Sequence, residues 1–233
     1  MERLDKTVSH KLNITRSEAK ALIKSGSVLV NNAPVKAADY KLIDTDRVSV
    51  NGRELLFDGF VYIMMNKPAG VVSASEDKKE KTVLDLLPGD MRRKGLFPAG
   101  RLDKNTTGFM LITDDGDFAH RILSPKKHVD KTYIALLDKP FDAEVIEEFK
   151  NGLELDGEKL LPAELEALDC DYTKAKIVIR QGIFHQIKRM FKEFGITVIE
   201  LKRIKIGKLT LDEGLGEGEA RYISKDELLL LQS

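Results

Sequence analysis

Hydrophobic and polar positions along this chain predict a fold in which strands outnumber helices. Six apolar runs of strand length occur from residue 60 onward, whereas the segments 142–152 and 184–195 repeat apolar residues at helical spacing. Because helices do not separate the strands regularly, we expect an α+β fold with a mixed, mainly antiparallel sheet flanked by helices, not a doubly wound parallel sheet. The strand runs are FVYIMMNK (60–67), FMLIT (109–113), TYIALL (132–137), AELEAL (163–168), AKIVIR (175–180) and ITVIELKRIKI (196–206).

Residues 1–59 have the pattern of a small separate domain. Thr15 and Glu18 form the signature of a capping box at the start of a helix, and Gly26 marks its end. An earlier helix is expected within RLDKTVSHKL, and the stretches SVLVNNAPV and DRVSVNG alternate as two strands of a small sheet. We therefore expect a module of two short helices and a sheet at 1–59, followed by a larger domain at 60–233.

The expected helix from Phe184 to Phe194 carries two periodic sets of residues. One set is apolar and predicts a stripe that faces the sheet, while the other is basic and predicts a charged face. Gly182 and the helix N-terminus next to this basic face favour an anion as its partner. The apolar set is Phe184, Ile187, Phe191 and Phe194, and the basic set is His185, Lys188, Arg189 and Lys192.

Composition narrows the class of protein. The 233 residues are 42% hydrophobic and 33% charged, with no net charge. No apolar stretch approaches the roughly 20 residues that cross a bilayer, and the charged N-terminus lacks the core of a secretory signal, so we expect a cytoplasmic protein without a membrane partner. Cys170 is the single cysteine, which excludes an internal disulfide, and we expect it to be half-buried. The four histidines show no metal-ligand spacing, so no metal is expected.

Charge is unevenly distributed along the chain. The segment from Lys176 to Lys208 contains nine basic residues and two acidic ones, whereas the charged residues of the stretch from Asp142 to Asp169 are mostly acidic. This segregation indicates that one face binds an anion.

Few standard catalytic motifs are present. We find no phosphate-binding Walker loop, no Rossmann glycine pattern, no nucleophile elbow and no zinc-protease motif. TDDGD (113–117) lacks the ligand spacing of a calcium loop and is interpreted as a polar turn. An enzyme of this sequence would instead use a lone carboxylate, and Asp103, within AGRLDKNTTGFMLIT, is the candidate, with Tyr133 and Lys188 as its partners.

The N-terminal module resembles the S4-type RNA-binding domain. The resemblance is carried by RLDKTVSHKL, by TRSEAKALIKSGSVLVNN and by the return strand Asp-Arg-Val-Ser-Val. It implies that five residues of the module face RNA. These are Arg3, Arg16, Ser17, Lys20 and Lys24.

The larger domain resembles the RsuA-type pseudouridine synthases. The segments GRLDKNTTGFMLITDDG, SPKKHVDKTYIA and IRQGIFHQIKRMF match the signature segments of that family in order, and NKPAGVV matches its opening motif. The resemblance implies that Asp103 is the catalytic aspartate, that the ring of Tyr133 packs against the target base and that Lys188 pairs with the aspartate. Many relatives have Arg where this chain has Lys188, and a lysine would orient the carboxylate less tightly.

The same resemblance implies a substrate-binding set around the catalytic residues. Arg101 would occupy or hold the space of the displaced nucleotide, and Leu201 would form a wall of the pocket. Three residues of the IRQGIFHQIKRMF segment complete the set, namely His185, Gln186 and Arg189.

The reaction implied is the isomerisation of a uridine in ribosomal RNA. It involves no redox change, hydrolysis or energy input, so no cofactor is expected, and the target nucleotide must be flipped out of its stack. Asp103 could act as a nucleophile or as a base, and the sequence leaves this open. HQIKRM, NKPAGVVSAS and TVLDLL are most similar to the branch that modifies one uridine of 16S rRNA, at the uridine-516 type site.

Alternatives to this reading remain open at the level of the sequence. The branch that acts on 23S rRNA shares the signatures and is the second hypothesis. A non-catalytic S4-containing protein that binds rRNA in ribosome assembly is the third, and a hydrolase with an acidic nucleophile is the fourth. We expect a monomer that acts on rRNA, either free or within an assembling small subunit.

Overall fold

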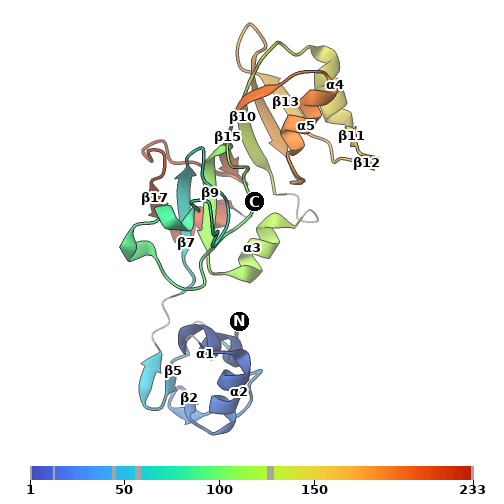
Figure 1. Cartoon of the computed structure of the whole chain (residues 1–233). Helices are drawn as coiled ribbons and strands as arrows, with labels where there is room; N and C mark the ends of the chain where they lie inside the picture. The colour runs from blue at the N-terminus through green and yellow to red at the C-terminus, as the bar shows by residue number, and fades with distance from the viewer. Residues whose placement is uncertain (1, 13, 44–45, 56–58, 125–128, 232–233) are drawn as a thin grey trace. The chain divides into compact units, whose positions relative to one another are not determined.

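The computed structural model describes residues 2–12, 14–43, 46–55, 59–124 and 129–231 (Figure 1). The chain forms two compact units, Met1–Gly59 and Phe60–Ser233. Residues 125–128 of the SPKKHVDKTYIA segment, and Asp58 beside the expected domain boundary, lie outside the described residues.

The first unit contains two helices and a small antiparallel sheet. Thr15 caps the second helix, since its Oγ1 accepts a hydrogen bond from the backbone N–H of Glu18 (3.2 Å) and the Glu18 carboxylate accepts one from the backbone N–H of Thr15 (2.7 Å). Asn31 and Asn32 adopt φ of 51° and 64°, as a tight turn between two strands requires. The elements are β1 (Glu2–Arg3), α1 (Leu4–Leu12), α2 (Arg16–Lys24), β2 (Val28–Val30), β3 (Ala33–Pro34), β4 (Lys41–Leu42), β5 (Val48–Val50) and β6 (Arg53–Leu55).

The main sheet of the first unit has the strand order β3-β2-β5-β6, and β1 pairs separately with β4. Leu4 and Val8 of α1 and Ala19 and Ile23 of α2 are fully buried against this sheet's apolar face. The buried apolar residues of the two helices therefore form the core of this unit together with the sheet.

The second unit is built on one nine-stranded sheet of order β13-β14-β10-β15-β9-β7-β17, with β8 on β9 and β16 on β15. Among the named strands of this sheet, β15 and β9 pair in parallel and the other neighbours pair antiparallel. The mixed, mainly antiparallel sheet is confirmed. The strands are β7 (Tyr62–Lys67), β8 (Phe97–Pro98), β9 (Thr107–Thr113), β10 (Lys131–Leu137), β13 (Glu164–Ala167), β14 (Lys174–Ile179), β15 (Val198–Ile206), β16 (Leu209–Thr210) and β17 (Ala220–Tyr222).

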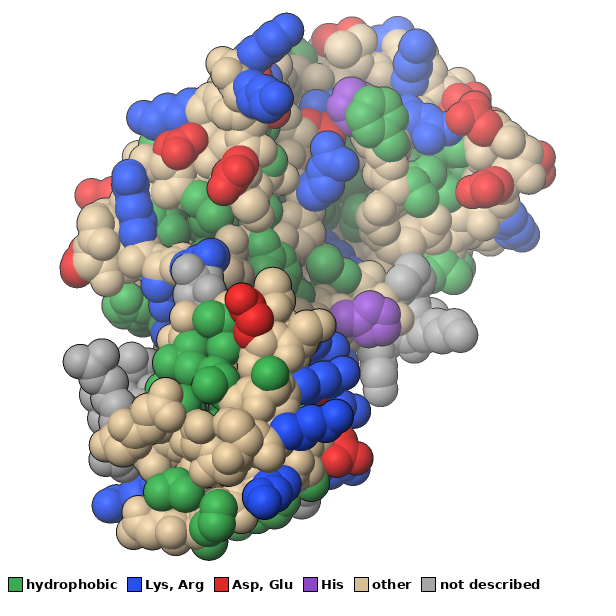
Figure 2. All heavy atoms as spheres, turned by 60° about the horizontal axis from the view of Figure 1, so that its bottom comes forward, with side chains coloured by type: hydrophobic (Ala, Val, Ile, Leu, Met, Phe, Trp, Pro, Cys, Tyr) green, Lys and Arg blue, Asp and Glu red, His purple; other side chains and the backbone are tan. Residues whose placement is uncertain are grey.

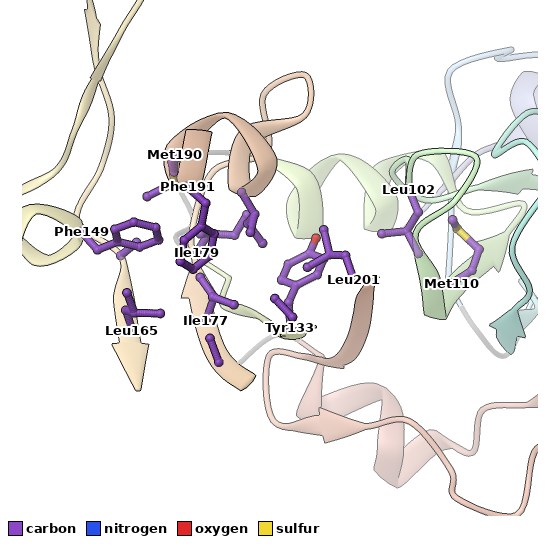
Figure 3. Packing of buried hydrophobic residues seen from close by; sticks show 14 of the residues in the cluster. Leu102, Met110, Tyr133, Phe149, Leu165, Ile177, Ile179, Met190, Phe191 and Leu201 are labelled. Carbon is purple, nitrogen blue, oxygen red and sulfur yellow. The ribbon is translucent and has the colours of Figure 1, made fainter. Parts of the chain in front are cut away.

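Helices cover different parts of this sheet (Figure 1). The helix α3 packs on residues of β9, whereas α4 and α5 lie beside β10 and β13. In the core under α5, Phe191 packs against Phe149 of α4 with ring centroids 4.9 Å apart, and Met190 points into the same cluster (Figure 3). The remaining elements are η1 (Leu84–Leu86), η2 (Gly89–Met91), α3 (Gly116–Leu123), α4 (Ala143–Asn151), β11 (Glu154–Leu155), β12 (Glu158–Lys159), α5 (Gln186–Glu193) and α6 (Lys225–Leu230).

TDDGD forms the polar turn between β9 and α3: Asp114 lies in a bend, and the Asp115 side chain accepts a hydrogen bond from the backbone N–H of Phe118 (2.9 Å) at the start of the helix. Two local expectations are wrong. Cys170 is exposed, because it lies in the turn between β13 and β14. Phe184 is 74% exposed and precedes α5, because His185 adopts φ 53° and interrupts the helical path there.

The centre of the sheet is a narrow seam between β9 and β15. Only two residue pairs join these strands, Thr107 with Lys202 and Gly108 with Arg203. Gly108 has φ +94°, and a Cβ there would lie 2.2 Å from the carbonyl oxygen of Arg203, so only glycine lets the strands approach. The buried Arg203 reinforces the seam by donating from Nε to the carbonyl oxygen of Phe109 (2.8 Å).

Candidate active site

Asp103 lies in a short loop between β8 and β9, beside the seam of the sheet. Its neighbour Leu102 is buried in the core, near Met110 of β9 (Figure 3), and anchors the loop. The backbone N–H of Thr106 donates to the carbonyl oxygen of Asp103 (3.1 Å) and closes a turn. The Asp103 side chain remains 25% exposed, so the loop presents a carboxylate that solvent or a ligand can reach.

The segment that follows β7 holds this loop in place. Ser73 Oγ donates to the carbonyl oxygen of Leu102 (2.8 Å) and accepts from its backbone N–H (3.0 Å). The backbone N–H of Gly70 donates to the carbonyl oxygen of Lys104 (2.9 Å). The NKPAGVVS stretch is therefore a clamp on the backbone of the Asp103 loop.

Lys67 is the centre of this clamp. Its fully buried Nζ donates to the carbonyl oxygens of Pro68, Lys104 and Thr106, each at 3.0 Å. Burial lowers the pKa of Lys67 to about 8, a shift that the nearby Asp103 carboxylate opposes and the Lys188 cation increases. A buried ammonium held by three carbonyls fixes the path of the chain on both sides of Asp103.

Two side chains from the start of α5 meet the Asp103 carboxylate. Lys188 Nζ donates to Oδ2 (2.8 Å), and His185 Nε2 lies 3.5 Å from Oδ1. Both belong to α5 or its N-cap, and this helix packs beside β10 and β13, whereas Asp103 precedes β9. The predicted pairing of Asp103 with Lys188 is thus present in the structure, and each carboxylate oxygen has a nitrogen neighbour.

Tyr133 and Leu201 lie on adjacent strands, β10 and β15, in the core cluster that also contains Leu102. Figure 3 shows the Tyr133 ring beside Leu201, and they are 8% and 7% exposed. An aromatic ring and an aliphatic side chain are therefore packed together on one face of the sheet, beside the buried Leu102 of the Asp103 loop.

The other predicted substrate-binding residues differ in position. Arg101 is exposed, two residues before Asp103. Gln186 is buried at 4%, with Oε1 accepting from the backbone N–H of Ile183 (3.2 Å). Arg189 pairs with Asp156 (2.5 Å) and is partly exposed. Gln186 and Arg189 thus make internal contacts in this structure.

The first unit presents a basic surface on α2. Arg16, Ser17, Lys20 and Lys24 are all exposed, and the three cations follow one another at four-residue spacing along one side of the helix. Arg3 is also exposed, but it forms an ion pair with the buried Asp5 through Nη2 (2.9 Å). Lys and Arg side chains gather along one side of this unit in the space-filling view (Figure 2).

The described residues contain neither a metal-binding cluster nor a membrane-spanning helix. Among residues 2–12, 14–43, 46–55, 59–124 and 129–231, no group of three or more His, Cys, Asp or Glu side chains could hold a metal ion. Within the same ranges, no helix has the length and apolar character of a membrane span.

Comparison with known proteins identifies this arrangement. Residues 61–193 match the family model described as RNA pseudouridylate synthase, and residues 2–48 match that of the S4 domain. The chain is 45% identical to ribosomal small subunit pseudouridine synthase A of Vibrio cholerae, with 97% of each chain covered. It belongs to the RNA pseudouridylate synthase family.

Other pseudouridine synthases are similar over nearly their whole length. The chain is 40% identical to ribosomal small subunit pseudouridine synthase A of Escherichia coli, covering 97% of this chain and 98% of the relative. An uncharacterized RNA pseudouridine synthase of Bacillus subtilis, YtzG, is 42% identical over 98% of both chains. A crystal structure of a pseudouridylate synthase superposes with a TM-score of 0.69 and 37% identity, covering 99% of this chain and all of that one. The chain is thus an RNA-modifying isomerase with an S4 domain.

Two clamp residues of this pseudouridine synthase are absent from the sequence-based candidates. Lys67 and Ser73 act on a loop about 30 residues further along the chain, and no spacing rule connects them to Asp103. Two signals point to this segment: NKPAGVV matches the opening motif of the family, and the NKP triplet places a lysine at the end of a buried strand, where burial without partners would be costly.

We expect Lys67→Met to reduce the rate of pseudouridine formation by about 100-fold, because loss of the three carbonyl contacts releases the Asp103 loop. Lys131→Met is the matched control. Lys131 is also buried, and its pKa is also lowered to about 8, but its Nζ donates to the carbonyl oxygen of Arg180 (3.2 Å) and not to the loop. Single-turnover rates on an RNA substrate compare the two variants.

Urea unfolding between pH 8 and 10 checks that both lysines are buried as described. Because their folded-state pKa values lie below the unfolded value, the unfolded chain binds more protons in this window and wild-type stability rises with pH. In each variant, the free energy of unfolding should rise with pH less steeply than in wild type, by at most about 1.4 kcal/mol per pH unit, because one buried lysine is missing. Equal activity of Lys67→Met and Lys131→Met would contradict the clamp.

Proposed function

We propose that this pseudouridine synthase isomerises a single uridine of 16S ribosomal RNA, at the uridine-516 type site. The similarity to ribosomal small subunit pseudouridine synthases A, over nearly the whole chain, supports the choice of RNA. The observation that carries the chemistry is the placement of one partly exposed carboxylate, Asp103, between a backbone clamp and the Lys188 cation.

In this reaction the N1–C1′ bond of the uridine breaks and a C5–C1′ bond forms. The proton on C5 leaves and N1 gains one, so the product is an isomer and no co-reactant is consumed. Asp103 starts the reaction, either as a nucleophile or as the base that removes a proton from the ribose. Lys188 holds the Asp103 carboxylate in its reactive orientation.

The apolar residues retain the base during the reaction. A base must leave the RNA stack before Asp103 can reach its sugar, and the Tyr133 ring receives it by stacking. Leu201 forms the wall beside Tyr133, so that the detached uracil rotates without escaping. Arg101 occupies or holds the space that the flipped nucleotide leaves, because it is exposed at the edge of the same loop. His185, at 3.5 Å from Asp103, contacts the substrate on the opposite side.

RNA binding is shared between the two units. Residues 1–59 act as the RNA-binding domain and residues 60–233 as the catalytic domain. The exposed cations and hydroxyl of α2 contact phosphates, which position the RNA without reading its sequence. We further propose that the protein works as a cytoplasmic monomer without metal or cofactor, on 16S rRNA either free or in an assembling small subunit.

We expect Asp103→Asn to abolish pseudouridine formation while leaving the fold and RNA affinity unchanged, because the amide keeps the shape of the carboxylate but loses its charge. Chemical mapping of 16S and 23S rRNA, after incubation with wild type or variant, measures both product and position. Thr106→Ser is a control in the same loop, since it retains a hydroxyl where Thr106 Oγ1 lies 3.5 Å from Asp103 Oδ2.

Each other outcome has a distinct meaning. Product from Asp103→Asn would overturn the assignment of Asp103. Product in 23S rRNA alone would replace the proposed substrate. Binding of rRNA by wild type with unchanged uridine would indicate a non-catalytic protein, and release of free uracil would indicate a hydrolase.

We expect replacement of Lys20 and Lys24 by Gln to weaken RNA binding and make it less salt-dependent, because each lost phosphate contact flattens the plot of log affinity against log salt by about 0.7 to 0.9. Titration of 16S rRNA at several salt concentrations measures the slope. Lys41→Gln, an exposed lysine on β4 and not on α2, is the control. Equal slopes for wild type and the α2 double variant would show that α2 does not contact phosphates.

A further inference from the structure

Phe184 is the most exposed large hydrophobic side chain among the described residues of this protein, at 74%. It lies in the turn before α5, where the sequence pattern predicts a core residue. The other three members of that apolar set, Ile187, Phe191 and Phe194, are buried or packed against the core. The structure therefore separates Phe184 from its set and turns it toward solvent.

A strained backbone conformation and several side-chain contacts hold Phe184 in this position. His185 adopts φ 53°, which is unfavourable for a residue with a side chain and is typical of functional sites. Gln186 Oε1 accepts from the backbone N–H of Ile183, and Arg189 Nη1 approaches the carbonyl oxygen of Phe184 at 3.5 Å. The ion pair of Arg189 with Asp156 steadies that arginine. Gln186 and Arg189 thus hold the turn that carries Phe184.

Phe184 is linked to the Asp103 carboxylate through the ring of His185. The ring of His185 lies 3.5 Å from Asp103 through Nε2, and the Phe184 ring lies on His185 with centroids 3.8 Å apart and planes at 17°. One face of the His185 ring carries Phe184, the edge of that ring at Nε2 faces Asp103, and Phe184 is the largely exposed outer layer of the two-ring stack.

The surroundings of Phe184 suit a nucleic acid. The exposed Lys192 follows within eight residues, and Lys188 and Arg189 remain partly exposed although they pair with Asp103 and Asp156. The helix N-terminus beside Phe184 has no side-chain cap. An aromatic ring surrounded by cations is the usual combination in proteins that bind single-stranded RNA, because every base has a face that can stack while the phosphates need neutralising.

We propose that Phe184 is a stacking platform for the unpaired nucleobase next to the target uridine, holding that neighbour while the uridine occupies the Asp103 site. The inference rests on the proposed function and adds to it a binding site for the flanking nucleotide. It assigns His185 to the layer between the two nucleotides, and Gln186 and Arg189 to positioning of the platform. The platform is sequence-tolerant, since stacking alone selects an unpaired base and not a particular one.

The test compares Phe184→Leu, which keeps an apolar side chain but loses the π face, with Phe184→Trp, which enlarges that face. Tyr222→Leu is the matched control, because Tyr222 is an exposed aromatic residue (47%) on β17 at the far edge of the sheet. Each change is made in the full chain with Asp103 intact for rates and with Asp103→Asn for affinity. The probe is a 16S rRNA fragment with 2-aminopurine beside the modified uridine, whose fluorescence falls on stacking.

Phe184→Leu should weaken affinity by about 5- to 150-fold, the range measured when one base loses its aromatic partner, and should abolish the protein-dependent quenching. Phe184→Trp should retain both, and Tyr222→Leu should equal wild type. Because Phe184 is exposed, all three variants should unfold at the same urea concentration as wild type.

The two proposals fail in different ways. If wild type forms pseudouridine while Phe184→Leu matches it in affinity, rate and quenching, the stacking platform is wrong and the proposed function stands. If wild type leaves rRNA uridines unchanged, the proposed function fails and the platform loses its basis. Equal losses of RNA affinity and quenching in Phe184→Leu and Phe184→Trp would also overturn the inference, since the defect would then not depend on the presence of an aromatic face.

Discussion

The ion pair between Asp103 and Lys188 is the constraint around which this fold is arranged. Its members are 85 residues apart, and they reach each other across a sheet whose two halves meet in only two residue pairs between β9 and β15. Gly108 lets those strands approach, and Arg203 bridges them through Phe109. A small relative movement of the halves would separate the carboxylate from its cation, so the seam is where structure and activity are most tightly linked.

A second set of contacts fixes the backbone of the loop that carries Asp103. Burying the Lys67 ammonium is unfavourable, and its hydrogen bonds to three carbonyl oxygens offset that cost. Two of these oxygens belong to the Asp103 loop. Ser73 adds a reciprocal pair of hydrogen bonds to Leu102. The Asp103 loop is thereby held by its backbone, which leaves the Asp103 side chain to interact with Lys188 and His185 and, in the proposed reaction, with the substrate.

Much of this arrangement is predictable from the sequence where the deciding forces are local. The Thr15 capping box, the helical apolar stripe of α2 and the strand runs each depend on neighbours within a few residues. The start of α3 is different, because Asp114 accepts from the backbone N–H of Val61 and Asp115 from the hydroxyl of Tyr62, 53 residues earlier. Lys67 likewise depends on distant partners, the carbonyl oxygens of Lys104 and Thr106. Phe184 satisfies the helical spacing, yet one left-handed residue removes it from the helix, and spacing does not reveal backbone strain.

The most direct test of the central constraint is the single-turnover rate of pseudouridine formation in 16S rRNA by Lys188→Arg and Lys188→Met. An arginine keeps the positive charge beside Asp103, whereas a methionine keeps the length and apolar stem but loses the charge. We expect Lys188→Arg to retain most of the wild-type rate, and Lys188→Met to lose about 100-fold or more with rRNA affinity nearly unchanged. A wild-type rate for Lys188→Met would contradict the account, because the carboxylate would then work without the cation that the fold brings to it.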